Sequence, residues 1–300
     1  MSDPNHSPPR PGPFEPRRLR QCKRRVANGF KQAAFLHRRV ATDLAERLEA
    51  VPRNFPRVLA IGGGGLFTDA VRERPELSER IGAITEADVA LGDVVLDPEN
   101  LPFAERAFDL IVSPLLLHWL NDLPGALIQF RRALRPDGLM LASLFGGETL
   151  NELRLSLLEA EEELTGGAGP RVAPFANLQD AAHLLQRAGF ALPAADREAV
   201  TARYSEPMGL LADLRSMGET AALVERSPRS LSRRILARTF DIYRARFSDP
   251  DGRIRATFEI LTLTGWAPHE SQQRPLKPGS AKKRLADALG ATEQSAGEKP

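Results

Sequence analysis

The chain has 300 residues, of which 42% are hydrophobic and 27% are charged. This composition excludes disorder throughout, because enough apolar side chains are present to bury one large core or two modest ones. The longest apolar run, around residues 115–120, is far shorter than the roughly 18 residues of a membrane-spanning helix. The single cysteine, Cys22, excludes an intramolecular disulfide and a thiolate metal cluster, and it is typical of a reducing compartment.

Positive charge is concentrated at the amino terminus. Residues 1–40 carry ten Lys and Arg side chains against two acids, whereas the net charge of the whole chain is only +2. Such a segment can be a transit peptide, an arm that neutralises nucleic-acid or lipid phosphates, or a basic helix on a partner surface. Aromatic residues do not alternate with the charges, and no nucleic-acid module is recognisable. We therefore expect docking to a protein or close to a membrane, and no nucleic-acid partner.

The first 50 residues divide into a leader and a helical region. Five prolines among residues 1–15 oppose helix formation, and we expect this leader to be disordered. Apolar residues then recur at steps of three and four within residues 16–50. This spacing predicts two amphipathic helices, from about Arg17 to Ala50, that pack on the core.

Strands and helices alternate in residues 51–148. The expected elements are, in chain order, a strand at 57–61, a helix at 66–73, strands at 80–85 and 108–113, a helix at 122–134 and a strand at 139–144. This alternation predicts an α/β fold with a mostly parallel sheet and helices on both of its faces.

Residues 149–270 are expected to complete the fold. Thr149, with Glu152 three residues later, predicts a capping box for a helix that runs to Leu164. The further predicted elements are a helix at 177–188, a strand through Val200 and Tyr204, and helices at 208–217 and 230–247. The turn at 249–252 predicts a terminal β-hairpin arm that includes residues 257–264. Residues 271–300 are expected to be a polar tail.

A glycine cluster directly follows the first predicted strand. Residues 62–65 are four consecutive glycines, and glycine lets backbone amides approach a ligand that larger side chains would exclude. A tight strand-to-helix turn also needs glycine, so the cluster alone supports both interpretations. About twenty residues later, Asp88 stands near the expected end of the second strand, where a carboxylate can accept the hydroxyl hydrogens of a ribose. Its alternative role is a helix N-cap or a solvated acid.

Further motifs follow in a fixed order. Residues 96–103 (LDPENLPF) and 108–113 (FDLIVS) precede His118-Trp119, and residues 134–138 (LRPDG) come last. With the glycine loop and Asp88, this order resembles the class I S-adenosylmethionine-dependent methyltransferases of the type 11 group. The resemblance implies a Rossmann-like fold that binds S-adenosylmethionine, with the turn at Asp97 near the adenine and Ser113 near the methionine part. The cofactor-binding residues that it implies are Gly62, Gly64, Asp88, Asp97, Glu99, Leu101 and Ser113.

Residues 144–154 (LFGGETLNELR) resemble a narrower group, the mitochondrial respiratory complex I assembly factor 5 and its bacterial relatives. The stretches 183–190, 217–219 and 265–272 follow the pattern of the same group. The malonyl-carrier-protein methyltransferases of biotin synthesis are similar mainly in the cofactor domain. The resemblance implies a protein substrate, such as a complex I subunit, and a bacterial cytoplasmic protein whose basic helix can dock peripherally at the inner membrane.

Two features depart from the family pattern. Ala60 stands where the first strand usually has an acid, and Leu66 replaces the third glycine of the loop. Loss of the acid removes a charge-assisted hydrogen bond worth roughly 1.5–3 kcal/mol. Only eight residues separate Asp88 from Asp97, which is too short for a helix and a strand. Either residues 93–96 supply the strand after a bare loop, or one layer on the flank of the sheet is missing.

Three functional hypotheses remain open at this level. A methyltransferase must align an acceptor and exclude water, and His118 is the candidate catalytic residue that touches the acceptor or takes its proton. The alternative for His118 is a structural histidine packed under Trp119. Hydroxylation of an arginine in a complex I subunit is implied by the resemblance alone: none of the five histidines has an acid two residues later, and no metal site is expected. The third hypothesis is a non-catalytic assembly scaffold with a degenerate cofactor site.

Candidate residues for the substrate or partner lie mainly in the carboxyl-terminal segment. They are Trp119, Arg154, Trp266 and His269, with Arg187, Glu219 and Glu270 in the same group-specific stretches. Each can line a groove for a protein substrate. Side chains of these types are also common as surface ion pairs or packing residues, so both interpretations stay open.

Overall fold

The computed structural model describes residues 12–225 and 231–273. Residues 1–268 form one compact unit and residues 269–300 a second one, of which only residues 269–273 are described. Most of the predicted leader and tail, and the first residue of the helix predicted at 230–247, therefore lie outside the described residues. The proposed division of the first unit near residue 148 stays a prediction.

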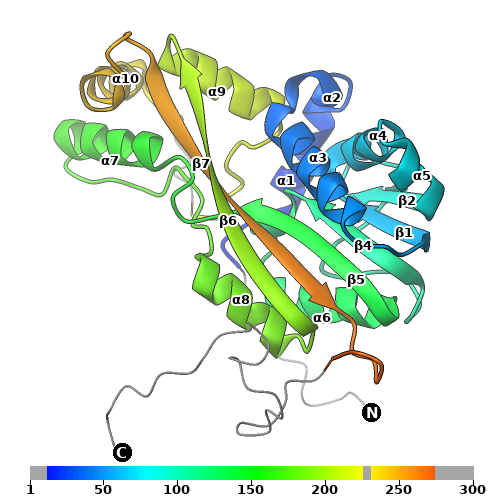
Figure 1. Cartoon of the computed structure of the whole chain (residues 1–300). Helices are drawn as coiled ribbons and strands as arrows, with labels where there is room; N and C mark the ends of the chain where they lie inside the picture. The colour runs from blue at the N-terminus through cyan, green and yellow to red at the C-terminus, as the bar shows by residue number, and fades with distance from the viewer. Residues whose placement is uncertain (1–11, 226–230, 274–300) are drawn as a thin grey trace, which may run out of the picture. The chain divides into compact units, whose positions relative to one another are not determined.

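The strands of the first unit form one seven-stranded sheet in the order β3-β2-β1-β4-β5-β7-β6 (Figure 1). They are β1 (Phe55–Ile61), β2 (Ile81–Asp88), β3 (Val94–Val95), β4 (Phe108–Pro114), β5 (Leu134–Phe145), β6 (Ala191–Tyr204) and β7 (Ile254–Trp266). The pairs β2–β3, β1–β2, β1–β4 and β4–β5 are parallel. Strand β7 pairs antiparallel with both β5 and β6. The predicted α/β class with a mostly parallel sheet is confirmed.

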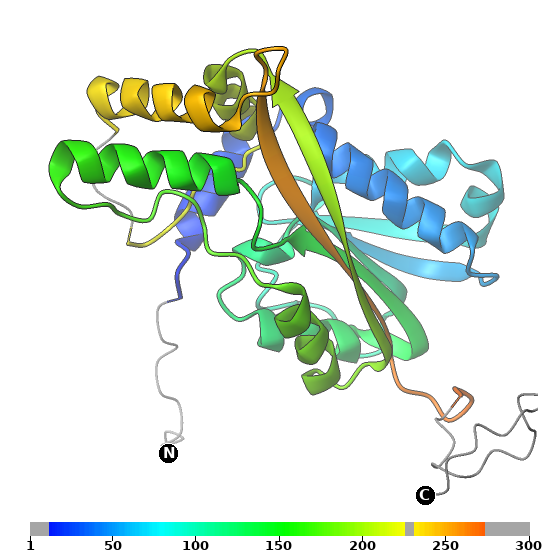
Figure 2. The same ribbon diagram turned by 60° about the vertical axis from the view of Figure 1, so that its left-hand side comes forward.

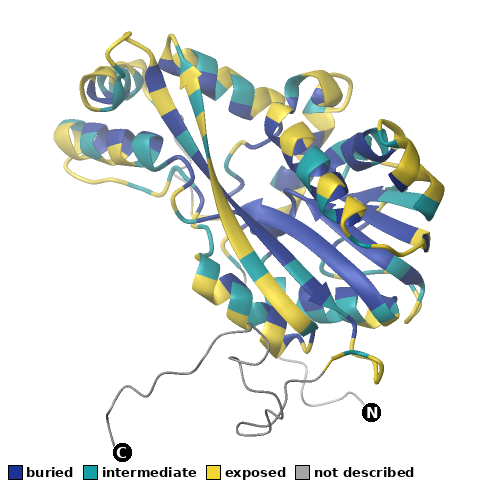
Figure 3. Cartoon of the chain, viewed as in Figure 1, coloured by how far each residue is buried: buried dark blue, intermediate teal, exposed yellow. Residues whose placement is uncertain are grey.

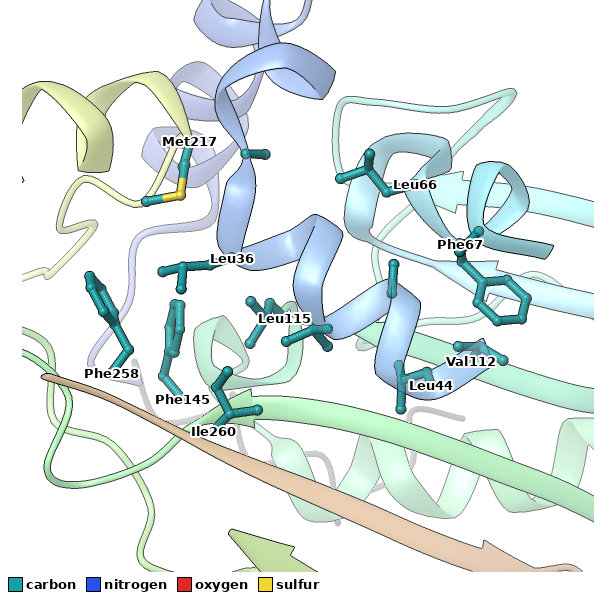
Figure 4. Packing of buried hydrophobic residues seen from close by; sticks show 14 of the residues in the cluster. Leu36, Leu44, Leu66, Phe67, Val112, Leu115, Phe145, Met217, Phe258 and Ile260 are labelled. Atoms are coloured by element: carbon teal, nitrogen blue, oxygen red, sulfur yellow. The ribbon is translucent and has the colours of Figure 1, made fainter. Parts of the chain in front are cut away.

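Alternate side chains of the central strands build two cores, because successive residues of a strand face opposite sides. Val58 and Ala60 of β1 belong to the core beneath α3, α4 and α5, whereas Leu59 and Ile61 belong to the core with α6 and α8. These helices are α3 (Phe35–Glu49), α4 (Leu66–Arg72), α5 (Pro75–Arg80), α6 (Leu123–Ala133) and α8 (Leu178–Arg187). Figure 3 shows the central strands as buried, and Figure 4 shows the packing between α3 and the sheet.

The amino-terminal region folds as three helices instead of the predicted two. They are α1 (Pro16–Val26), α2 (Phe30–Ala33) and α3. Ala34 interrupts the second predicted helix with a ψ of 60°, which is outside the helical range. The backbone N–H of Glu15 and the guanidinium of Arg18 donate to the carbonyls of Ala222 and Ala221, so α1 is tied to the segment that follows α9 (Pro207–Ser216).

The short link after β2 contains no helix. Residues 89–93 are a bare loop, and β3 consists of only two residues, which pair with Ala87 and Asp88 of β2. The chain therefore takes the first of the two predicted routes, with a strand from within residues 93–96. The physical reason is length, since eight residues cannot supply a crossover helix and a strand.

The predicted capping box is wrong. Leu150 is the N-cap of α7 (Asn151–Thr165), with a φ of 55° and no side-chain cap. The hydroxyl of Thr149 instead bonds both backbone groups of Glu259 in β7, and the carboxylate of Glu152 accepts hydrogen bonds from Thr257. The neighbouring strand offers buried backbone partners, and these outcompete the local cap.

The carboxyl-terminal segment also differs from expectation. Residues 257–264 do not form a separate hairpin arm at the 249–252 turn, because β7 is inserted into the main sheet between β5 and β6. α7 and α10 (Arg233–Phe247) lie side by side next to α9 (Pro207–Ser216) (Figure 2). Among the described helices, none combines the length and the apolar character needed to cross a bilayer.

Candidate active site

The glycine loop connects β1 to α4. Gly62, Gly63, Gly64 and Gly65 all have positive φ angles, which only glycine adopts without strain. A Cβ atom on Gly64 would lie 2.8 Å from the ring of Phe30, and one on Gly62 would lie 2.8 Å from Cβ of Leu116. The loop thus needs glycine for its conformation and for close approach by its neighbours. Phe30 of α2 brings the amino-terminal helices directly over it.

Asp88 ends β2, next to the carboxyl end of β1. Its side chain is buried, and its Oδ1 accepts the backbone N–H groups of Ala90 (2.9 Å) and Leu91 (3.1 Å). Burial raises the pKa of Asp88, while the Lys23 charge and these backbone hydrogen bonds act in the opposite direction. The carboxylate therefore organises the shortened loop itself, and a ribose would have to use its remaining acceptor positions.

The turn that contains Asp97, Glu99 and Leu101 docks onto the start of α6. Asp97 Oδ1 accepts the N–H of Glu99 at 3.0 Å, and Glu99 Oε1 accepts the N–H of Asp122 at 2.9 Å. The N–H of Leu101 donates to Gln129 of α6 at 2.9 Å. These contacts explain why the motif forms a turn. The predicted contact of this turn with an adenine stays a prediction.

Ser113 lies at the carboxyl end of β4, the strand next to β1. Its side chain is fully buried, and its Oγ has no hydrogen-bond partner among the described residues. Buried hydroxyls are normally satisfied, so an orphan at this position points to a polar group that is supplied by a ligand. The glycine loop, Asp88 and Ser113 stand at the carboxyl ends of adjacent parallel strands, where α/β folds bind their ligands. These residues fit a nucleoside-containing cofactor such as S-adenosylmethionine.

A buried polar cluster centres on Glu219, just after α9. Lys23 Nζ of α1 lies 2.7 Å from Glu219 Oε1, and His37 Nε2 of α3 lies 3.2 Å from the same oxygen. On the other oxygen, Trp119 Nε1 donates at 2.8 Å and His118 Nε2 lies at 3.1 Å. Four segments that are distant in the chain thus meet at one carboxylate. We call these five residues the Glu219 cluster.

Burial and charge together set the protonation of the Glu219 cluster. Burial raises the pKa of Glu219, but the Lys23 charge, the hydrogen bond from His118 and the close approach of His37 outweigh it, so the pKa lies well below its ordinary value. Burial lowers the pKa of His37 to about 4, and it also lowers the pKa of His118. Glu219 is therefore ionised near neutral pH, and both histidines are uncharged.

Neutral His118 has a defined tautomer. Its Nε2 proton points to Glu219, which leaves Nδ1 as a bare acceptor. Nδ1 is buried and has no hydrogen-bond partner among the described residues, and the ring lies 4.6 Å from that of Phe145 between centroids. His118 can thus accept a proton or a hydrogen bond through Nδ1, while Glu219 holds the ring in place.

Two cavities flank this region. A cavity of about 940 Å³ is bordered by α1, α7, α9 and residues 170–175, and it reaches Trp119, Phe145 and Glu219. A smaller cleft of about 520 Å³ lies beside the glycine loop and is lined by Gly64, Gly65, Glu86 and the Gly92–Asp93 link, among others. In the described part of the chain, no group of three or more His, Cys, Asp or Glu residues is arranged to hold a metal ion.

Comparisons with known proteins show the family to which this chain belongs. Residues 68–142 match the methyltransferase domain family. The human mitochondrial arginine-hydroxylase NDUFAF5 is 39% identical over 261 residues, which cover 82% of this chain and 74% of the human protein. The chain belongs to the class I S-adenosylmethionine-dependent methyltransferase superfamily.

A second relative supports this family, and a solved structure supports the fold. A malonyl-[acyl-carrier protein] O-methyltransferase of Halorhodospira halophila is 33% identical over 273 residues, which cover 85% of this chain and 90% of that protein. The crystal structure of a methyltransferase candidate from Bacillus halodurans shares the fold, with a TM-score of 0.50 at 14% identity over 76% of this chain and 99% of that one. The predicted family and fold are confirmed.

The remaining candidate residues for the substrate or partner lie in different parts of this chain's structure. Trp119 borders the large cavity, whereas Arg154 donates to the carbonyls of Gly147 and Thr149 and holds the turn before α7. Trp266 pairs with Leu139 near the start of β5, at the end of the strands opposite to His118. The Arg53 guanidinium lies 4.8 Å from the centroid of the Trp266 ring.

Three candidates are found outside the site as described. His269 belongs to the second unit, where its Nδ1 lies 2.7 Å from the hydroxyl of Ser271. Arg187 and Glu270 are exposed. Sequence reasoning missed Lys23 and His37 and treated Glu219 as one of several groove residues. No local pattern could have joined them, because Lys23 and Glu219 are 196 residues apart.

Proposed function

We propose that the protein is a methyltransferase that uses S-adenosylmethionine and acts on a protein partner during the assembly of respiratory complex I. The observation that carries the proposal is the convergence of the glycine loop, Asp88 and the unpartnered Ser113 hydroxyl at adjacent strand ends. The superfamily and the similarity to NDUFAF5 support it. A protein substrate is proposed by analogy with that relative.

S-adenosylmethionine, when bound, supplies an activated methyl group on its sulfonium sulfur. The backbone of Gly62 and Gly64 would hold it, with Asp88 at the ribose and Ser113 at the methionine part. Phe30 and the helices around it would exclude water above the loop. His118 Nδ1 would accept a hydrogen bond or a proton from the acceptor group, and Glu219 would hold the imidazole in place.

Calorimetric titration with S-adenosylmethionine and S-adenosylhomocysteine tests the cofactor site. We expect micromolar binding that falls at least tenfold in Asp88→Ala and is unchanged in Gly147→Ala, since no atom lies within 4 Å of a Cβ added at Gly147. No binding at millimolar ligand would refute the proposal. Bound cofactor without labelled methyl transfer to complex I subunits would refute the transferase step alone.

Arginine hydroxylation of a complex I subunit is the second candidate, and the name of the human relative is what favours it. Mass spectrometry of subunits isolated with and without the protein separates the two reactions. Methylation adds the mass of CH₂ to the target residue, whereas hydroxylation adds the mass of one oxygen atom. The Asp88→Ala protein serves as the control for either modification.

A non-catalytic scaffold is the third candidate. Ala60, Leu66 and the bare loop after Asp88 favour it, because they leave fewer contacts for the cofactor. A scaffold predicts that Gly64→Val and Asp88→Ala still support complex I assembly in cells that lack the native protein. An enzyme predicts that both variants fail in this complementation assay.

We further propose that the protein works on the cytoplasmic side of the bacterial inner membrane, with α1 as its docking element. Arg17, Arg24 and Arg25 of α1 are exposed, whereas Lys23 is buried in the Glu219 cluster. Membrane flotation with anionic vesicles tests this placement. The charge-reversed Arg17→Glu/Arg24→Glu variant is expected to lose vesicle binding, and equal binding by both proteins would contradict it.

A further inference from the structure

The large cavity has a buried apolar wall and exposed charged side chains at its border. Its buried wall is made of Phe145, Leu153, Leu157 and Phe258, whose side chains are at most 5% exposed. Arg25 of α1 and Arg215 of α9 border the same cavity and are exposed. A molecule that fills the cavity would therefore meet hydrocarbon inside and guanidinium groups at the entrance.

The charges that line the cavity are unequal. Of its four arginines, Arg171 is paired with Glu161, and Arg18 donates to the carbonyl of Ala221. Within the described chain, Arg25 and Arg215 have no carboxylate partner. The only acid that lines the cavity in the described chain is Glu219, whose charge is already matched by the ammonium of Lys23.

We infer that this cavity binds a ligand with an anionic headgroup on an apolar stem, such as the carboxylate of a medium-length acyl chain. The apolar stem would displace water from the buried wall, so affinity should rise with the length of the stem. The headgroup would lie between Arg25 and Arg215, where bidentate guanidinium contacts favour carboxylate and phosphate. A cationic side chain would meet repulsion at the same entrance.

This inference goes beyond the proposed function and concerns a ligand of the cavity next to the same site. The stem of such a ligand would lie against Phe145, next to His118. An arginine side chain would have to pass unpaired guanidinium groups without finding a free carboxylate. The cavity therefore favours an acidic, apolar ligand over a basic one.

Trp119 provides a direct reporter of binding. It borders the cavity, and the other tryptophan, Trp266, lies at the opposite end of the strands, next to Leu139. In the Trp266→Phe protein, the fluorescence of Trp119 is titrated with decanoate, decyl phosphate, butyrate and decyltrimethylammonium, each below its micelle concentration. We expect saturable changes with decanoate and decyl phosphate, at least tenfold weaker binding of butyrate, and none with the cationic amphiphile.

The two arginines are tested by charge reversal in the same background. Arg25→Glu/Arg215→Glu is expected to weaken decanoate binding at least tenfold. Arg233→Glu/Arg234→Glu changes the net charge equally at exposed positions of α10 that do not border the cavity, and it is expected to bind as the parent does. Relative affinities of decanoate and decyl phosphate show whether the natural headgroup resembles a carboxylate or a phosphate.

Equal binding of decanoate and decyltrimethylammonium would overturn the inference, as would unchanged affinity in Arg25→Glu/Arg215→Glu. If that variant does not fold, a salt titration of the parent decides the question. Affinity for decanoate must then fall as sodium chloride rises, because the contact at the mouth is ionic. No cofactor is present in these titrations, so a failure here is distinct from a failure of cofactor binding or methyl transfer.

Discussion

The glycine-loop edge and the Glu219 cluster are adjacent but built in different ways. The glycine loop depends on the backbone conformation of four consecutive glycines, and the loop after Asp88 depends on the bonds from Ala90 and Leu91 to Asp88. The Glu219 cluster joins α1, α3, the turn at His118 and the end of α9. The first region is local in sequence, and the second exists only in the folded chain.

This difference shows where the protein can tolerate change. Backbone-built sites tolerate changes of individual side chains, which is consistent with Ala60 and Leu66 at positions where the family pattern predicts an acid and a glycine. A buried ion cluster depends on each of its members, since any charge left alone in the interior is strongly destabilising. We therefore expect the largest effects on stability at the Glu219 cluster, and the largest effects on cofactor binding at the glycine loop.

Removal of the central carboxylate should have the largest effect. Glu219→Ala leaves Lys23 buried without a partner, and we expect the free energy of unfolding to fall by about 3–5 kcal/mol. Urea unfolding measures it. Lys23→Met/Glu219→Leu removes both charges and should recover more than half of the loss. A fall of less than 1 kcal/mol in Glu219→Ala would show that the cluster is not structurally important.

Acid should destabilise the protein through the same cluster. The pKa of His37 is about 4 in the folded chain against 6.5 when unfolded, so the unfolded state binds more protons between these values. Stability from this group is present above pH 6.5 and is lost as pH falls toward 4, by up to about 1.4 kcal/mol for each pH unit. Urea unfolding between pH 7 and 5 measures the slope. His37→Phe should flatten it, and an unchanged slope would contradict the assignment.

The glycine loop should respond mainly in cofactor binding. Gly64→Val forces a β-branched residue to a φ of 54° and places its Cβ against Phe30, so we expect a cost of about 1–3 kcal/mol in stability. Affinity for S-adenosylmethionine should fall more than tenfold in calorimetry. Gly147→Ala provides the matched control in open space. Native affinity in Gly64→Val would place the cofactor elsewhere.

The last effect, on stability alone, is expected where a local cap was predicted but a strand contact formed. Thr149→Val removes the hydroxyl that bonds the backbone of Glu259, and it should lower the free energy of unfolding by about 1–3 kcal/mol. Thr149→Ser keeps the hydroxyl and should lose less. If the two variants are equally stable, the hydroxyl contributes nothing to the junction between α7 and β7.

Much of the fold was predictable from local patterns. The strands near residues 57–61 and 108–113 and the helices that follow them appear close to their predicted bounds, because apolar periodicity and turn residues act over short distances. Where prediction failed, a distant segment had intervened. β7 was expected to form an arm but is paired on both sides in the sheet, and its backbone also takes the contacts predicted for the cap at Thr149.

The amino-acid sequence by itself determined the alternation of strands and helices, the glycine loop, the acid Asp88 at the end of β2 and the superfamily to which these features point. Only the tertiary structure decided that Lys23 is buried and pairs with Glu219, that His118 has an Nδ1 without a partner among the described residues, and that Arg25 and Arg215 line one cavity. The physical reason is range. Periodicity and turn chemistry are written in neighbouring residues, whereas burial, pKa and charge pairing arise between side chains that folding alone brings together.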